Sequence, residues 1–227
     1  MGSDSPPFFV LEEGILRSRY DTDVEKAKPT NRGEAARCSR CNGAIGMLTW
    51  LPPYRVKLVM HGEELGDFIK VVGDDLLVSE RFARIFKDEG LTGLSGFHPV
   101  EVVRVSRKGR GPKPTDVPRY LTVTASLGGA ALDLTRSRIH ADGPPSCPEC
   151  LYTTKDAVHG FALEVDTWRG EDIFRPRGMF GSLVVSERFE RFVVKHGFTN
   201  MRLTPTEEYV WNPLGRDPAP PMKPPSS

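Results

Sequence analysis

The sequence lacks an apolar run that could span a bilayer, which takes about 20 residues, so we expect no membrane contact. Its first residues carry neither the basic nor the apolar region of a secretory signal, and we expect a cytoplasmic protein. Basic charge is not in excess either, since 31 Lys and Arg residues face 30 Asp and Glu residues. Proteins that wrap nucleic acid usually show such an excess. We therefore expect no nucleic-acid partner.

Sequence motifs of catalysis are also missing. The chain has no G-x-S-x-G, no Walker loop and no HExxH, the patterns that announce common hydrolases and nucleotide-binding enzymes. Its five histidines are scattered singly, and nothing places a nucleophile beside a base. We expect that the protein is not an enzyme.

Glycine (22) and proline (20) are frequent, which favours short strands and turns over long helices. Two segments have little to bury: residues 1–7, and residues 214–227, which are rich in proline. We expect a flexible N-terminus and a flexible or polyproline-like tail.

A repeat runs through the rest of the chain. Residues 77–82 read Leu-Val-Ser-Glu-Arg-Phe, and residues 184–189, 107 positions later, read Val-Val-Ser-Glu-Arg-Phe. The match continues at the same spacing, with Gly90 and Thr92 corresponding to Gly197 and Thr199. Self-similarity at a fixed distance indicates repeated structural units, so we predict two related halves.

Each copy of the repeat predicts a strand followed by a short helix. Ser79 and Ser186 suit the N-cap, where a serine oxygen accepts a hydrogen bond from the first turn. Gly90 and Gly197 stand where a helix commonly ends with a left-handed residue. The predicted apolar helix faces comprise Phe82, Ile85 and Phe86 in the first copy and Phe189, Phe192 and Val193 in the second.

Further strands are predicted at 54–60, 100–105, 120–126, 161–165 and 209–211 from their β-branched or alternating residues. We expect an α+β fold of two halves, 8–105 and 120–213, each a small antiparallel sheet with one short helix. Residues 106–119, which include a basic run from Arg107 to Lys113, are expected to form a linker loop.

All four cysteines fall in two CxxC pairs, one in each half: Cys38 with Cys41, and Cys147 with Cys150. Two intervening residues let both thiolates of a tight turn face one metal ion, and four thiolates complete the tetrahedron of a structural zinc site. We predict that these four residues bind one structural Zn²⁺ and join the two halves.

Other interpretations of the cysteines are less favoured. A redox CxxC needs a helix N-terminus in a thioredoxin-like unit, and no convincing buried strand precedes either pair. Disulfides are disfavoured in a cytoplasmic chain. A zinc deaminase would pair H-x-E with P-C-x-x-C. His61-Gly62-Glu63 fits the first part, but Ser146 precedes Cys147 and the other CxxC would be unexplained.

The paired CxxC motifs, the duplicated V-S-E-R-F and the sequence from Glu207 to Pro213 resemble the double-CXXCG motif immunity proteins of myxobacteria. The resemblance covers roughly Phe8 to Leu214. It implies a cytoplasmic protein of bacterial competition that binds and neutralises a cognate swarming-inhibition toxin encoded beside it. The family has glycine after its second cysteine, whereas Asn42 and Leu151 stand here, so we expect a less regular second turn.

Two alternatives come from other functional classes. A zinc-ribbon-like nucleic-acid-binding or regulatory module would need the basic residues between Arg107 and Lys113 to gather on one face. A redox or hydrolytic enzyme would need an open metal position or a reactive thiol.

Overall fold

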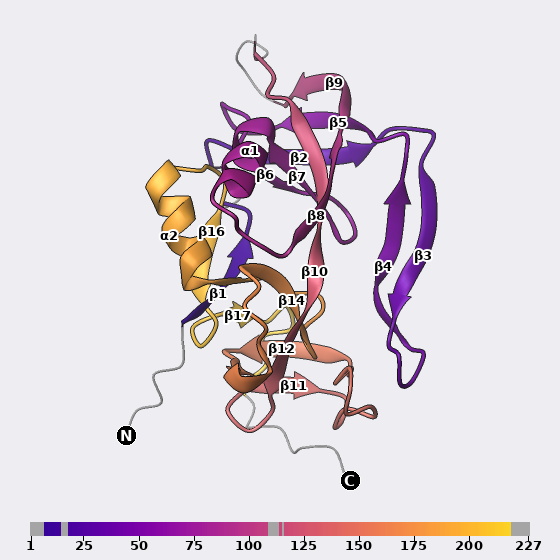
Figure 1. Ribbon diagram of the computed structural model, residues 1–227, viewed down its shortest axis with the longest axis vertical. Coiled ribbons are helices and arrows are strands. Elements are labelled where there is room, and N and C mark those ends of the chain that lie inside the picture. The colour runs from indigo at the N-terminus through magenta and orange to yellow at the C-terminus, as the bar shows by residue number, and fades with distance from the viewer. Residues whose placement is uncertain (1–6, 15–17, 109–113, 115, 219–227) are drawn as a thin grey trace.

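The computed structural model describes residues 7–14, 18–108, 114 and 116–218 (Figure 1). Most of the N-terminus (1–6), the middle of the expected linker (109–113 and 115) and the end of the expected tail (219–227) lie outside the described residues.

A nine-stranded sheet forms the centre of the fold, in the order β16-β1-β15-β14-β10-β7-β6, with β13 and β8 also paired to β10. Its longest strand, β10, runs through the middle of the molecule and pairs with strands on both sides (Figure 1). The strands are β1 (Phe8–Glu12), β6 (Phe68–Lys70), β7 (Asp75–Ser79), β8 (Leu94–Pro99), β10 (Tyr120–Asp133), β13 (Ala162–Glu164), β14 (Ile173–Arg177), β15 (Val184–Ser186) and β16 (Arg202–Pro205).

Smaller sheets flank this centre. One has the order β2-β5-β9, the second β11-β12-β17, and β3 and β4 form a hairpin that lies along one side (Figure 1). Their bounds are β2 (Thr22–Lys26), β3 (Asn31–Arg37), β4 (Ala44–Leu51), β5 (Arg55–Met60), β9 (Glu101–Arg107), β11 (Ile139–Ala141), β12 (Lys155–His159) and β17 (Val210–Trp211). A short 3₁₀ turn, η1, spans Val165–Thr167.

The α+β prediction is confirmed, because the chain is mostly sheet with two short helices. The expectation of a separate antiparallel sheet in each half is wrong. Strand β10, from the predicted second half, pairs with β7 and β8 of the first, and β1 pairs with β15 and β16. Two of the pairings, β10 with β14 and β5 with β9, are parallel. The strands of the two halves are therefore interleaved.

Both predicted helices form and are capped as expected. In α1 (Glu80–Asp88) the Ser79 hydroxyl accepts a hydrogen bond from the Phe82 N–H at 3.1 Å. In α2 (Glu187–His196) Ser186 accepts one from Phe189 at 3.3 Å. The predicted apolar faces meet in one core, where the rings of Phe82, Phe86, Phe189, Phe192 and Phe198 pack together.

A buried aspartate ties the start of α1 to the segment after α2. Asp67 accepts hydrogen bonds from Ser79 Oγ at 2.6 Å and from the Arg81 guanidinium at 2.8 Å. It also accepts one from the backbone N–H of Thr199 at 3.0 Å. Burial raises the pKa of Asp67, but the hydrogen bonds from Arg81, Ser79 and Thr199 outweigh it and hold this pKa below its ordinary value.

The same contacts recur around Asp172, with the roles of α1 and α2 exchanged. Asp172 accepts from Ser186 Oγ at 3.0 Å, from Arg188 at 2.9 Å and from the Thr92 N–H at 2.9 Å. Each of these partners lies 107 positions from its counterpart around Asp67. The sequence match therefore corresponds to a match in side-chain contacts.

Each arginine also caps the opposite helix. Arg81 donates to the carbonyl of His196 at 3.1 Å, at the end of α2, and Arg188 donates to that of Glu89 at 2.6 Å, just after α1. The last carbonyls of a helix lack partners within it and carry partial negative charge. The end of each helix is thus held by the arginine of the other helix, and a buried aspartate fixes that arginine in place.

We predict that Asp172→Asn destabilises the protein by about 2–3 kcal/mol, because it weakens charge-assisted hydrogen bonds to a buried acceptor. The Asp172 side chain is 3% exposed, whereas that of Arg188 is 51% exposed, so the loss stays below that of a fully buried pair. Urea unfolding measures the change. Asp142→Asn, at an exposed position, is the matched control, and equal stability of the two variants would contradict the clamp.

Candidate metal centre

The first CxxC forms the turn between β3 and β4. Cys38 and Cys41 lie at the tip of this hairpin, where the Asn42 N–H donates to the Cys38 carbonyl at 2.9 Å. The Cys38 N–H donates to the carbonyl of Gly43, also at 2.9 Å. Asn42 has a left-handed backbone, with φ of 59°, a conformation that asparagine adopts more readily than most residues.

The second CxxC lies in the loop between β11 and β12 and repeats this turn. The Leu151 N–H donates to the Cys147 carbonyl at 2.9 Å, and Leu151 is left-handed with φ of 53°. The two turns therefore share this hydrogen bond and a left-handed residue after the second cysteine, although one residue is asparagine and the other leucine. Burial of the Leu151 side chain, which is 8% exposed, offsets the strain of about 1–2 kcal/mol.

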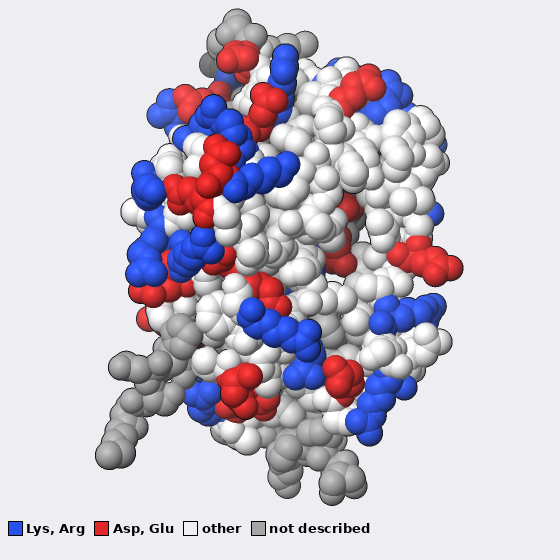
Figure 2. All heavy atoms as spheres, in the orientation of Figure 1, with Lys and Arg blue, Asp and Glu red and all other residues white. Residues whose placement is uncertain are grey.

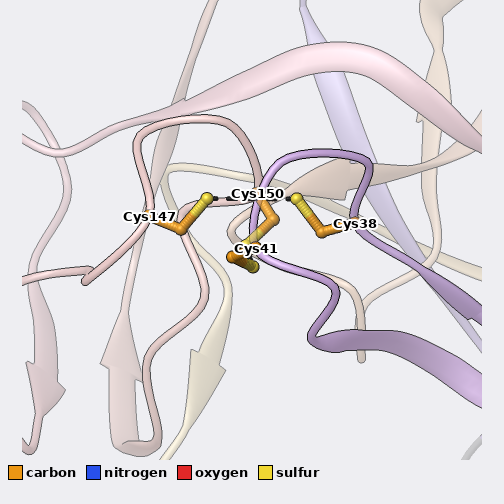
Figure 3. A group of neighbouring side chains, drawn as sticks. All are labelled: Cys38, Cys41, Cys147 and Cys150. Carbon is orange, nitrogen blue, oxygen red and sulfur yellow. Dashed lines mark hydrogen bonds between the residues drawn. The ribbon is translucent and has the colours of Figure 1, made fainter.

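The two turns bring the four sulfur atoms together (Figure 3). The Sγ atoms of Cys38 and Cys147 are 3.9 Å apart, those of Cys41 and Cys150 are 3.8 Å apart, and all four lie within 4.8 Å of one another. Zn–S bonds of about 2.3 Å in a regular tetrahedron place sulfur atoms about 3.8 Å apart. A disulfide needs about 2.05 Å. The arrangement is compatible with a metal site.

The environment of the sulfurs favours thiolates at the first cysteine of each pair. The backbone N–H of Cys41 lowers the pKa of Cys38, and that of Cys150 lowers the pKa of Cys147 to about 7. Burial raises the pKa of Cys150 to about 12. Three of the residues are buried and Cys41 is exposed. Because the thiolate is the form that binds metal, these backbone N–H groups favour the metal-binding form of Cys38 and Cys147.

The helix N-terminus that a redox CxxC requires is not seen at either cysteine pair, since one is in a hairpin turn and the other in a loop between strands. His61, the residue that suggested a deaminase, instead contacts Asp23 at 2.8 Å. Among the described residues, the four cysteines form the one group of His, Cys, Asp or Glu side chains that lie close enough together to hold a metal ion.

The hairpin that carries the first cysteine pair contacts the rest of the protein at three levels. Near its base Trp50 is buried, with the Lys26 ammonium 4.4 Å from the centre of its ring. Midway, the Met47 N–H donates to Asp74 at 2.6 Å. At the tip the sulfurs meet, packed against Ile45 and Phe180. Most of the other hairpin side chains are exposed, so the tip depends on the cysteines for its position.

Charge on the surface is mixed. Figure 2 shows Lys and Arg side chains interspersed with Asp and Glu over the side that carries α1 and α2. A nucleic-acid-binding module would need the basic run to gather on one face, but only its first residues are described: Arg107 ends β9, and 109–113 lie outside the described residues. The face drawn in Figure 2 has no broad basic area of the kind that nucleic acid requires.

Sequence reasoning missed the two buried aspartates. A signal for them was present, since Asp67-Phe68-Ile69 and Asp172-Ile173-Phe174 each place an acid before two apolar residues, 105 positions apart. The spacing differs by two residues from that of the helix motif, so a search at a fixed distance passes over the match. Nothing in the sequence indicated that Lys155 lines a pocket.

Comparison with known proteins gives the family. The model of the Imm11 immunity protein family matches residues 43–208, well over half of the chain. The chain belongs to the Imm11 immunity protein family. The comparison with curated proteins finds no match. The Imm11 match includes Cys147 and Cys150 but begins after Cys41, so the tip of the hairpin precedes the matched segment.

Membership of Imm11 confirms the resemblance to an immunity protein family. Neither α1 nor α2, the two α-helices of the described residues, is long and apolar enough to cross a membrane.

We predict that Asn42→Val destabilises this Imm11 protein by about 1–2 kcal/mol relative to Asn42→Gly. A β-branched residue is strained in the left-handed region, which glycine adopts freely. The Asn42 side chain is exposed, so packing changes little. Chemical unfolding of both variants at one fixed metal concentration measures the difference, and identical midpoints would argue against a left-handed residue in this turn.

Proposed function

We propose that this protein binds a cognate antibacterial toxin and neutralises it, as the resemblance to double-CXXCG motif immunity proteins implies. The Imm11 match over residues 43–208 carries the proposal. Immunity of this kind requires a complementary surface and no chemistry of its own. The protein acts in the cytoplasm, where thiols stay reduced, and is not an enzyme.

We also propose that one structural Zn²⁺ is held by Cys38, Cys41, Cys147 and Cys150. The donor set fits this ion, because four thiolates are typical of closed structural sites and the sulfur separations of 3.8 and 3.9 Å match the tetrahedron. Such a site has no open position for water. The ion would fasten the β3–β4 hairpin to the loop after β11, two segments that share few other restraints.

The two halves are proposed to descend from one duplicated unit, which zinc joins through one CxxC from each. Support comes from the repeated V-S-E-R-F segment and from the reciprocal contacts of Asp67 and Asp172. The matching left-handed residues after the cysteine pairs, Asn42 and Leu151, agree with this origin.

Cys38→Ser is predicted to give a metal-poor and less stable protein, because structural metal binding is coupled to folding. Purified wild type should contain about one zinc per chain by elemental analysis, and the variant much less, with a lower unfolding midpoint. Ser39→Ala, at the exposed neighbouring position, should retain both properties. A fully stable Cys38→Ser protein would refute the structural role of the ion.

Toxin neutralisation is tested with the gene beside the one for this protein. Expression of that neighbour in a sensitive host should reduce survival, and co-expression of this protein should restore it. The two proteins should co-purify as a complex. If the neighbour is toxic and co-expression gives no rescue, the proposed function is wrong for this chain.

A further inference from the structure

A pocket of about 450 Å³ opens beside the second cysteine turn, where the β11-β12-β17 sheet meets the segment after β14. Its principal lining residues are Tyr152, Lys155, Met179, Phe180, Tyr209 and Trp211. Pockets that are mainly apolar with a few polar groups commonly bind ligands.

Lys155 is the one charged residue among the described residues that line this pocket. Its ammonium donates a hydrogen bond to the Thr153 carbonyl at 3.1 Å. Burial lowers its pKa to about 8, with no contribution from a neighbouring carboxylate. The adjacent acid, Asp156, pairs with Arg216 at 3.1 Å instead. The pocket therefore holds a poorly solvated positive charge with donors to spare.

Aromatic side chains form the rim. Tyr152 is 55% exposed and Trp211 is 44% exposed, although both are large apolar residues. Tyrosine and tryptophan are the residue types most enriched among those that dominate binding energy at protein interfaces. An apolar group bound next to the lysine would cover this rim.

The pocket is physically continuous with the cysteine cluster. Tyr152 follows Cys150 closely in the chain, and the Cys150 carbonyl accepts a hydrogen bond from the N–H of Gly178, another lining residue. Phe180 packs against the cysteines and also lines the pocket. The cluster thus supports one wall.

We propose that this pocket is part of the toxin-binding surface and receives a carboxylate of the toxin, carried next to an aromatic or large apolar side chain. The inference rests on the proposed function and names the chemistry of the partner. A single ammonium among apolar walls matches one monovalent anion. A phosphate group would call for more cations or a cradle of backbone amides.

Three small probes test the pocket without the toxin: N-acetyl-phenylalanine, which has a terminal carboxylate, N-acetyl-aspartyl-phenylalaninamide, which has only a side-chain carboxylate, and the uncharged N-acetyl-phenylalaninamide. Amide chemical shifts of ¹⁵N-labelled protein report binding. One or both acids should bind with perturbations at Tyr152 and Trp211, at least tenfold more tightly than the uncharged amide. Which acid binds identifies the source of the carboxylate, and equal binding of all three, or of none, would overturn the proposal.

Lys155→Met removes the charge and keeps the length of the side chain. It should weaken binding of the preferred acid and of the toxin at least tenfold, while Lys57→Met, at an exposed lysine of β5, should change neither. Because the Lys155 ammonium is desolvated, methionine should leave the unfolding midpoint unchanged or higher. Trp211→Ala should weaken toxin binding without loss of fold.

The outcomes separate the two proposals. If the wild type binds the toxin and Lys155→Met binds it equally well, the pocket inference is wrong while the proposed function stands. If the wild type binds no toxin but binds an acid probe through Lys155, the proposed function fails and the pocket remains a carboxylate site for another partner.

Discussion

Two buried carboxylates hold the fold together. Asp67 and Asp172 each fix the start of one helix and, through an arginine, the end of the other. Since α1 and α2 share one phenylalanine core, any relative movement of the helices would expose aromatic surface and also break the hydrogen bonds from the Thr199 and Thr92 amides to the buried carboxylates. Both changes cost free energy. The strands that lead into the two helices, β7 and β15, both lie in the central sheet, so this pair of helices is anchored to it.

Local features were predictable, because they depend on neighbours in the chain. The serine caps, the left-handed glycines and the α+β class follow from residues within a few positions of one another, and the repeat pointed to two equivalent helices. Strand pairing was not predictable in the same way. Nothing in Tyr120–Asp133 specifies that one strand will pair with β7 at one end and with β14 at the other, since that choice is made by packing of distant segments.

The candidate metal site, too, was predictable only in part. Spacing alone suggested that the four cysteines would converge, and the sulfurs do lie together. The hairpin that delivers the first pair was not foreseen, because Asn31–Arg37 has no β-branched residue and no buried face. The pocket at Lys155 is assembled from β12, the segment after β14 and β17. Its lysine differs from surface lysines only through an environment that the linear sequence does not display.

The position of β1 has a consequence for the order of events in the cell. This strand, Phe8–Glu12, begins the described chain, yet its neighbours in the sheet are β15 and β16, which end at Ser186 and Pro205. Translation must pass Pro205 before β1 can pair with both of these neighbours, and pairing of such distant segments is slow compared with local folding. The central sheet thus stays incomplete on a growing chain even after β6 to β14 have been made.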